Sequence, residues 1–592
     1  MNKQIFYAFA LTILLANCKG NPRSNQAGSG DIAFQKLSEE FLEGYISWRP
    51  QYGVFLGLHE YDGKITDFSK TSIDAELSQL KAFEKKFTQI DTGTLSSNMK
   101  FDQRIFLNTI RNEILNFEDI QVFKYNPMVY FDPTGLIDGI LAMDLSIYLN
   151  RSFAPLEDRF KSILSLEKEI SRIVTDAKSN LADSLPKPYI ESAIEIVNGF
   201  ADFLKNDLNL VLIYIKNDSV TKSFKTINKG AIDGLVGFVS YLEKEKLPKA
   251  TDNYAIGIQN YQKMLLFEDI SITPGKLLQI GLKELEKEQE AFKEVAKIIN
   301  PDIPPLHVFN NMKKEHPTAE TLIPQSANRI EAIWQFIVNK NLLTIPSNVR
   351  AKVKEMPQYM RSYAAMMDIP GPFDTKATEA YYFITPVNPQ WTVKQKDEWL
   401  SLFNYYTSDL IAIHEAYPGH YVQFLHVNAS SASKIEKVYM DYAFTEGWAH
   451  YTEQMMIDEG FGNSGNPIEA SKYKLAQLNE SLVRLCRYCV SIKMHCFGMS
   501  VDEATKFFID NCYLAEKPAQ LESIRATYDP RSLFYTLGKL QIIKLREDYK
   551  NQEGANFSLQ KFHDKFLDHG MPTIQQMRET MLKDNLVWND IL

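Results

Sequence analysis

Residues 276–299 read KLLQIGLKELEKEQEAFKEVAKII, and this stretch is the clearest indication of fold class in the chain. Its apolar residues recur every three or four positions, which is the spacing of one face of an α-helix. Glutamate and lysine residues follow each other at helical spacing on the remaining surface, as on a helix exposed along one side. The stretch therefore predicts a long amphipathic helix that packs against a larger body.

The same periodicity continues on both sides of this stretch. Strand signals are few and short, and the clearest is EAYYFIT at 379–385, which two prolines follow closely. The sequence therefore predicts a mainly α, large multi-helix and two-lobed fold with a small β element. Further long helices are expected at 34–48, 73–87, 101–117, 156–180, 189–212, 475–497 and 533–549.

The length and composition of the chain allow such a body. Its 592 residues are 45% apolar and 23% charged, which is ordinary for a globular protein and sufficient for two lobes. Proline-rich breaks at 301–305 and 368–372 are candidate joints. We expect a helical N-terminal region at 33–300 and a helical C-terminal region at 301–592. The formal net charge of −9 is small and offers no basic surface for phosphate, so nucleic acid is not expected as a partner.

Residues 1–18 have the pattern of an export signal. A short basic start precedes a nearly continuous apolar run at 5–16, which is too short to span a bilayer. The run ends in Leu-Ala-Asn-Cys at Cys18, which resembles a bacterial lipoprotein cleavage box, although asparagine stands where a smaller residue is usual. We expect an exported protein of the bacterial cell envelope, held to the membrane only by a lipid on Cys18, with 19–32 as a flexible tether. An ordinary secretory signal or an uncleaved anchor is the alternative.

The motif HEAYPGHYVQ at 414–423 contains two histidines and a glutamate after an apolar run. Charged groups at the end of a buried segment need compensation, and a metal ion can provide it. His414 and His420 are six residues apart, which is about 240° around a regular helix, whereas the simplest zinc motif places its histidines four apart. Pro418-Gly419 can distort the helix enough to bring both together. From the spacing alone, a helix that ends at Pro418 with a surface histidine after it stays an alternative.

A second segment, FTEGWAHYTEQ at 444–454, supplies carboxylates. Glu446, His450 and Glu453 fall at i, i+4 and i+7 of a predicted helix at 442–459 and form one polar stripe. Glu446 is the candidate third ligand, with His450 or Glu453 supporting the ligands from behind. Two alternatives stay open: His450 as a ligand in place of His420, and a solvated polar face without a metal.

These residue types point to hydrolytic chemistry. Two imidazoles and one carboxylate are a typical ligand set of catalytic zinc, which keeps a fourth position for water. Glu415, beside the metal, would accept the proton of that water as a general base. The motif therefore predicts a hydrolase with one Zn²⁺ ion as cofactor and a peptide as substrate.

The region 381–462 resembles the DUF885 family, bacterial proteins often described as lipoproteins and similar to zinc metallopeptidases. The matching pieces are PVNP at 386–389, FNYY at 403–406, HEAYPGHYVQ at 414–423, FTEGWAHY at 444–451 and EQMM at 453–456, with a looser match through 484–545. The resemblance implies a largely helical, gluzincin-like fold of the oligopeptidase type. It also implies that His414, His420 and Glu446 bind zinc and that Glu415 is the general base.

Members of this family also tend to carry an arginine, Asp-x-Gly-x-His and Tyr-x-x-Gly further along the chain. Arg487, His495 and Tyr535 occupy those places here, while Ser491 stands at the aspartate position and 529–531 read Asp-Pro-Arg where the family has Pro-Gly-Gln. Tyr535 is the first candidate donor to the oxyanion of the reaction and His495 the second. A position in the apolar core is the alternative for both.

The strand predicted at 379–385 could bind a peptide substrate as an added strand along the edge of a sheet. The cysteines at 486, 489 and 496 lie in one helical pattern, which is typical of buried apolar residues and not of a second zinc site. The rival functions are a non-catalytic surface lipoprotein that binds a peptide or protein partner in a cleft, and a zinc hydrolase of another amide or of an ester. The presence of a general base, Glu415, favours the peptidase over the binding protein.

Overall fold

The structure, a computed structural model, describes residues 28–132, 141–356, 361, 364–584, 588 and 592. The predicted export signal, with Cys18, and the predicted tether up to residue 27 lie outside the described residues. Within the last residues of that tether, helix α1 already begins at Asp31, and the backbone N–H of Gly30 donates to the carbonyl oxygen of Thr94 at 3.0 Å. The chain is therefore in contact with the folded body before residue 33.

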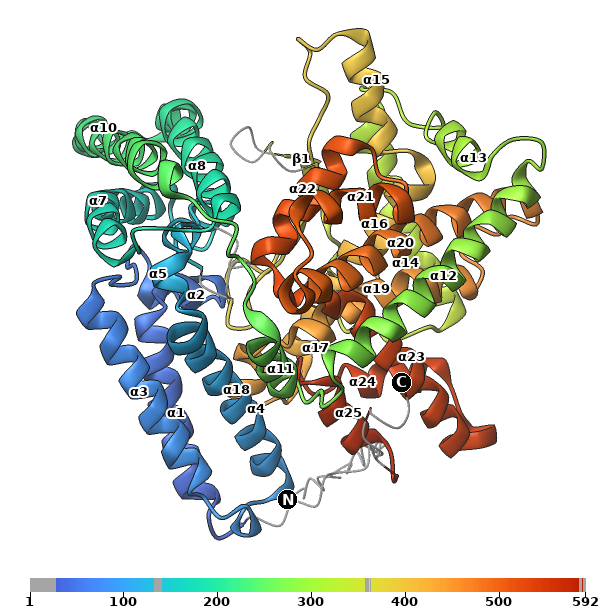
Figure 1. Cartoon of the computed structure of the whole chain (residues 1–592), viewed down its shortest axis with the longest axis horizontal. Helices are drawn as coiled ribbons and strands as arrows, with labels where there is room; N and C mark the ends of the chain where they lie inside the picture. The colour runs from blue at the N-terminus through green and yellow to red at the C-terminus, as the bar shows by residue number, and fades with distance from the viewer. Residues whose placement is uncertain (1–27, 133–140, 357–360, 362–363, 585–587, 589–591) are drawn as a thin grey trace, which may run out of the picture.

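Helices dominate the described chain, as predicted, and Figure 1 shows them in two groups. The N-terminal group lies on the left of Figure 1 and comprises α1 Asp31–Trp48, α2 Pro50–Phe55, α3 Lys70–Thr88, α4 Ser97–Ile114, α5 Val122–Tyr125, α6 Ser146–Asn150, α7 Leu156–Asn180, α8 Lys187–Asp202, α9 Leu208–Val211 and α10 Asp218–Tyr241.

The C-terminal group lies on the right of Figure 1. It comprises α12 Pro274–Ile299, α13 Pro305–Met312, α14 Leu322–Lys340, α15 Val393–Leu402, α16 Tyr405–Glu415, α17 His420–Ala429, α19 Tyr442–Asp458, α20 Pro467–Phe497, α21 Val501–Cys512, α22 Glu516–Tyr528, α23 Phe534–Glu553, α24 Leu559–Phe566 and α25 Ile574–Met581. Two helices, α11 Gly257–Phe267 and α18 Lys434–Val438, lie between the groups and contact α4.

The amphipathic stretch that indicated the fold class forms α12 and packs along α20. The hydroxyl of Tyr488 donates to the carbonyl oxygen of Leu277 at 3.0 Å, and a Cβ on Gly281 would lie 2.4 Å from the Tyr488 ring. Glycine at 281 thus allows the two long helices to approach closely, and apolar residues of α12 reach the core. Most charges of α12 stay outside, except Glu288, which pairs with the buried Lys539 at 3.2 Å. The predicted division of the chain near residue 300 stays a prediction. Helix α12 lies before residue 300 in the chain and packs on α20, which lies after it.

The helix predicted at 475–497 starts eight residues earlier, at Pro467. Asn466 caps its first turn by accepting a hydrogen bond from the backbone N–H of Ile468, and proline suits the first helical position. The first two turns are exposed or half-buried, so they carry no apolar periodicity. The helix predicted at 101–117 also differs, since α4 ends at Ile114 and a π-helical turn follows at Leu115–Ile120.

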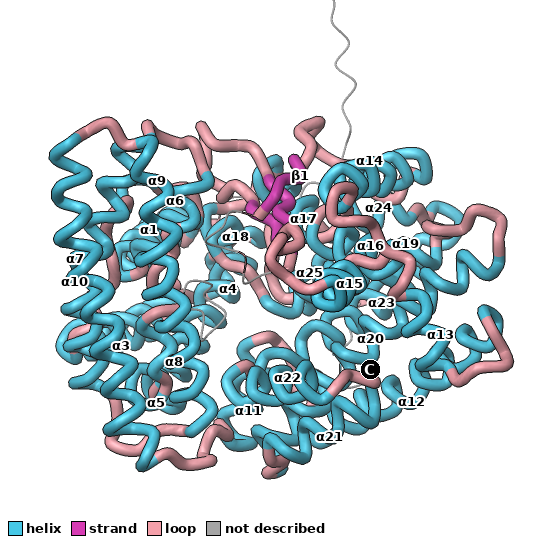
Figure 2. Tube along the Cα trace, turned by 90° about the horizontal axis from the view of Figure 1, so that it is seen from above, coloured by secondary structure: helices cyan, strands magenta, loops and turns pink. Residues whose placement is uncertain are grey.

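The small β element is a three-stranded sheet, seen in magenta in Figure 2. Its strands are β1 Lys352–Glu355, β2 Ala365–Asp368 and β3 Tyr381–Ile384, in the order β1-β3-β2, with β1 parallel and β2 antiparallel to β3. The strand predicted at 379–385 is therefore the central one, and both of its edges are already paired. The prediction that it binds substrate as an added strand is wrong, because a central strand has no free backbone groups to offer.

Among the described residues, none of the helices combines the length and the apolar character that crossing a membrane requires.

Candidate metal centre

The two histidines of the HEAYPGH motif lie on either side of a break between helices. His414 is the second-last residue of α16, and His420 is the first residue of α17. Between them, a Cβ on Gly419 would lie 1.7 Å from the carbonyl oxygen of His414, so only glycine fits. The indole N–H of Trp448, on α19, donates to the carbonyl oxygen of Pro418 at 2.9 Å and holds the turn in place. The turn thus lets two residues that are six apart face the same point.

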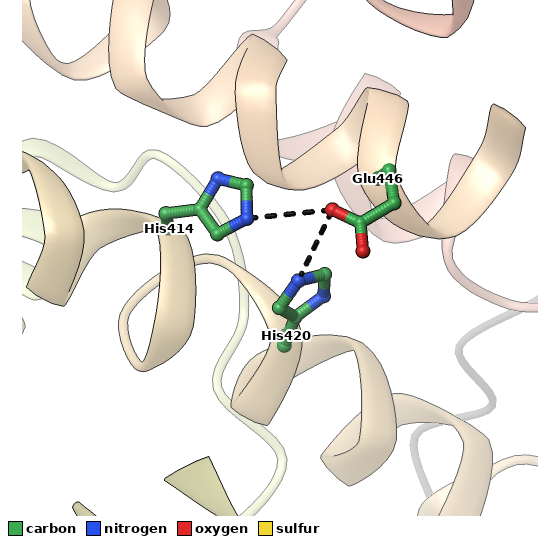
Figure 3. A group of neighbouring side chains, drawn as sticks. All are labelled: His414, His420 and Glu446. Atoms are coloured by element: carbon green, nitrogen blue, oxygen red, sulfur yellow. Dashed lines mark ion pairs between the residues drawn. The ribbon is translucent and has the colours of Figure 1, made fainter. Parts of the chain in front are cut away.

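The third group at this point is Glu446, as Figure 3 shows. The Nε2 atom of His414 lies 3.4 Å from Oε2 of Glu446, and Nε2 of His420 lies 3.6 Å from the same oxygen. One ligand atom from each residue can be chosen so that all lie within 4.8 Å of one another. Ligands around one tetrahedral zinc ion at its usual bond lengths are about 3.4 Å apart, so the three groups have the spacing of a metal centre.

The bonding of Glu446 also fits a cation. Its buried Oε2 atom accepts no hydrogen bond from any described residue. Burial alone would raise the pKa of Glu446, but His420 and His414 hold it well below its usual range, so the group is a carboxylate. A buried carboxylate oxygen between two imidazoles, without a hydrogen bond, is a site where a metal ion supplies the missing partner.

His414 is oriented by residues on the far side of its ring. Its Nδ1 atom lies 2.7 Å from Oε1 of Glu453, which also pairs with Arg484 at 3.0 Å. The other oxygen of Glu453 lies 3.3 Å from Nδ1 of the fully buried His450. A histidine that donates Nδ1–H to a carboxylate directs Nε2 at the ion. Glu453 and His450 therefore lie behind the His414 ring, and the structure does not bring His450 to the place of His420.

His420 has a comparable support within the same motif. Its Nδ1 atom lies 3.1 Å from Oε1 of Gln423, one helical turn further along α17, and Gln423 is almost fully buried. The amide nitrogen of Gln423 in turn donates to the carbonyl oxygen of Phe444 at 3.4 Å. The glutamine at the end of the motif thus fixes the ring orientation of the second ligand, a role that its i+3 spacing from His420 could have suggested.

Glu415 follows the first ligand and stays partly exposed. Its carboxylate makes no hydrogen bond or ion pair with the described residues. Burial lowers the pKa of His420, whereas Glu446 and, less strongly, Glu415 raise it. The Glu415 charge therefore lies close to the His420 ring. A free carboxylate at that position can accept a proton from a group bound beside the ligands.

Tyr535, on α23, lies near enough to Glu446 for the Glu446 charge to act on its hydroxyl. The hydroxyl of Tyr442 donates to the hydroxyl of Tyr535 at 3.5 Å, and the guanidinium groups of Arg484 and Arg487 lie 6.0 and 5.6 Å from its ring centre. Burial and then the Glu446 charge raise the pKa of Tyr535, so its hydroxyl stays protonated and can donate a hydrogen bond. Tyr442 and Arg484 were not among the residues singled out in the sequence. The signal for Arg484 was its charge among the apolar residues Leu482, Val483 and Leu485 of the predicted helix.

The structure does not bring His495 to this group. Its Nε2 lies 2.9 Å from the carbonyl oxygen of Ala526, and its Nδ1 accepts from the backbone N–H of Ile256 at 3.3 Å. Burial lowers the pKa of His495 to about 4, so the ring is neutral and both nitrogens are engaged by backbone. It also lies about 16 Å along α20 from Arg484, given the rise of a helix. Its neighbour Ser491, at the family's aspartate position, donates to the carbonyl oxygen of Pro530 at 2.7 Å.

Two of the three cysteines of α20, Cys486 and Cys489, are fully buried in the core, and Cys496 is half-buried and packs against it. Among the described residues the metal-capable group contains no cysteine. This position agrees with the interpretation of these cysteines as apolar residues of a helix.

Known proteins resemble this chain over most of its length. The family described as "Bacterial protein of unknown function (DUF885)" matches residues 50–581. A putative lipoprotein of unknown function from Shewanella oneidensis has a similar structure, with a TM-score of 0.76 and 23% identity, over 93% of this chain and 100% of that one. A putative lipoprotein from Colwellia psychrerythraea has a TM-score of 0.74 and 17% identity, over 92% of this chain and 98% of that one. At these identities the likeness is one of fold. A comparison with curated proteins found no significant match.

Proposed function

Because the chain belongs to the DUF885 family of bacterial proteins, whose function is unknown, we propose a function from the geometry of the site: a zinc-dependent hydrolase that cleaves peptide bonds. The observation that carries this proposal is the meeting of His414, His420 and Glu446 at the spacing of ligands around one ion. The gluzincin-like architecture implied by the family motifs is part of the same proposal.

The donor set supports zinc as the metal. Two imidazole nitrogens and one carboxylate oxygen suit this ion, and three protein ligands leave a position open for chemistry. When bound there, zinc supplies a Lewis acid that lowers the pKa of water and polarises a carbonyl group. His414 and His420 would hold it through Nε2, because the Nδ1 atoms of both rings are engaged by Glu453 and Gln423.

Glu415 would transfer the proton in the reaction, and Tyr535 would stabilise the charge that develops on the substrate. Glu415 accepts a proton from the attacking water and passes it to the leaving amine nitrogen. Tyr535 donates a hydrogen bond from its hydroxyl to the oxygen of the scissile carbonyl as negative charge develops on it. Support for these roles comes from the unpaired carboxylate of Glu415 and from the position of Tyr535 beside Glu446.

The proposal extends to location. The apolar run ending at Cys18 suggests export and lipidation, and the two similar structures are described as putative lipoproteins. We therefore place the site on an exported protein of the bacterial envelope, anchored by lipid and acting on peptides there.

The rival proposals differ in what Glu415 does. A lipoprotein that only binds a partner has no use for a free carboxylate beside the ligands, whereas a zinc hydrolase of another amide or of an ester would use the same groups.

The proposal is tested by metal analysis of the full chain and by its cleavage of a mixed peptide library, each measured for the wild type and for Glu415→Gln. We expect one zinc per chain, peptide cleavage, and a loss of 10²-fold or more in kcat in the variant with zinc content unchanged. A well-folded protein that takes up no zinc, or a variant as active as the wild type, would overturn it.

A further inference from the structure

A pocket of about 300 Å³ opens from the candidate metal centre toward the N-terminal helices. Glu446 and Tyr442 on α19, Tyr45 on α1 and Asn112 on α4 are among the residues that line it. We propose that this pocket is the subsite for a bulky apolar side chain of an oligopeptide substrate, next to the bond that is cleaved. The inference rests on the proposed function, because Glu446 links the pocket to the reacting carbonyl group.

The walls of the pocket are mainly apolar and aromatic. They include Phe41, Tyr52, Phe55, Val438 and Met440. Aromatic walls of this kind bury large apolar groups well, and the volume is at the small end of ligand sites. The pocket therefore has room for one large side chain and not for a folded partner.

Two tyrosines of these walls have hydroxyl groups that the protein already engages. The hydroxyl of Tyr45 donates to Glu113 at 2.8 Å, and Glu113 also pairs with Arg49 at 3.0 Å. The hydroxyl of Tyr52 donates to the carbonyl oxygen of Val438. Because these groups are satisfied internally, they add little attraction for a charged side chain.

One further acid, Glu268, lies on the wall beside Asp441. Burial raises the pKa of Glu268, and burial together with Glu268 raises that of Asp441 well above its usual range. The Arg531 guanidinium, which also lines the pocket, lowers the pKa of Glu268 and offsets its charge. Beyond Glu446, the mainly apolar walls of the pocket favour an apolar occupant over a charged one.

A second pocket, of about 270 Å³, borders on some of the same residues as the first. The two share Asn112, Asn116 and Arg531 as lining residues, and Asn253 and Asn260 add further amide groups to the second. Amide side chains can hydrogen-bond the backbone of an extended peptide. Asn116 lies in the π-helical turn that follows α4, a local distortion often found at functional sites. The second pocket beside the apolar one offers room for further residues of a substrate longer than a dipeptide.

The test compares oligopeptides that differ only in one residue, phenylalanine or alanine, at the cleavage site. Burial of the phenyl ring predicts that the zinc-loaded full chain cleaves the phenylalanine peptide with a kcat/KM roughly ten-fold or more above that of the alanine peptide. Asn112→Trp places an indole at the pocket wall and should remove most of this preference, measured as the ratio of the two kcat/KM values. Asn112→Gln is the matched control and should keep the preference.

Binding provides a readout that does not depend on turnover. Calorimetric titration of the zinc-loaded Glu415→Gln protein should show roughly ten-fold tighter binding of the phenylalanine peptide, and the additional change Asn112→Trp should abolish the difference. If Asn112→Trp does not fold, Phe55→Ala serves instead and should also reduce the preference. Binding with the expected preference but without cleavage by the wild type would keep this inference and overturn the catalytic proposal. Cleavage or binding without preference for the phenylalanine peptide, or a preference that both pocket variants leave intact, would overturn the inference.

Discussion

Gly447 and Gly538 face each other where α19 crosses α23. A Cβ on Gly447 would lie 2.6 Å from the Cα of Gly538, and a Cβ on Gly538 would lie 2.1 Å from the carbonyl oxygen of Ala443. Neither helix could carry a side chain at this crossing without moving. The close approach has a direct consequence for the site, because Glu446 precedes one glycine and Tyr535 lies one turn before the other.

Gly538→Ala should therefore damage both stability and the site. The added methyl group would push α23 away from α19, and overpacking of this kind costs about 1–3 kcal/mol in the free energy of unfolding. We expect a lower midpoint in urea and weaker zinc binding, measured with a competing chelator. Gly237→Ala on α10 is the control, since a Cβ there meets nothing within 4 Å and should leave stability equal or slightly higher. Equal effects of the two changes would contradict the tight crossing.

Glu453→Gln should weaken metal binding without removing a ligand. Glu453 orients His414 through a 2.7 Å contact with Nδ1. The amide NH₂ of a glutamine could donate to Nδ1 instead, and this would disfavour the tautomer with the proton on Nδ1 that metal binding through Nε2 requires. Loss of such a partner typically reduces metal affinity 10- to 100-fold. Competition with a chelator of known affinity measures the change. Glu480→Gln, which alters the other acid bound to Arg484 at 3.0 Å, should leave zinc affinity almost unchanged.

Zinc should stabilise the fold in a concentration-dependent manner. A ligand that binds only the native state at 100 times its Kd adds about 2.7 kcal/mol to the free energy of unfolding. We expect the melting temperature to rise with added zinc after chelation, and His420→Ala to remove most of this rise. Calorimetry or circular dichroism measures the shift. A rise of the same size in the variant would mean that zinc binds elsewhere.

Glu167 on α7 should make stability depend on pH. Burial raises the pKa of Glu167 to about 7, while the amide of Asn228 donates to it at 3.1 Å and lowers the pKa. Because the folded-state pKa exceeds the unfolded value, the native state holds the proton longer, and stability falls as pH rises from about 4.5 to 7. Glu167→Gln removes this loss.

The measurement is urea unfolding at pH 4.5 and at pH 8. Glu167→Gln should be nearly neutral at pH 4.5 and more stable than the wild type at pH 8, by up to about 3 kcal/mol. Glu169→Gln, a half-exposed position on the same helix, should show no such difference between the two pH values. A variant equally stable relative to the wild type at both pH values would show that Glu167 ionises normally in the folded state.

Much of the helical fold was predictable because local periodicity carries it. The helix predicted at 156–180 has the same bounds as α7, and the stretch at 276–299 differs from α12 only at its first turn. Apolar spacing failed where no apolar face exists, as in the exposed first turns of α20. It also could not distinguish a central from an edge strand at 379–385, because pairing partners lie elsewhere in the chain.

The sequence by itself determined the residue types of the site and the helices that carry them. His414, His420 and Glu446 could be named from their motifs, and so could Glu415 and Tyr535 as their partners. His495 shows the limit of such reasoning. In the sequence, a histidine whose ring is hydrogen-bonded to two backbone groups looks the same as a histidine that faces a substrate.

Only the tertiary structure decided how these groups meet. Six residues of regular helix would turn His420 away from His414, and the break that prevents this depends on Gly419 against His414 and on Trp448 from a different helix. The position of Glu453 and His450 behind His414, outside the group of His414, His420 and Glu446, likewise depends on how α16, α19 and α20 pack together. Such contacts join residues far apart in the chain, and they leave no periodic signal from which they could be inferred.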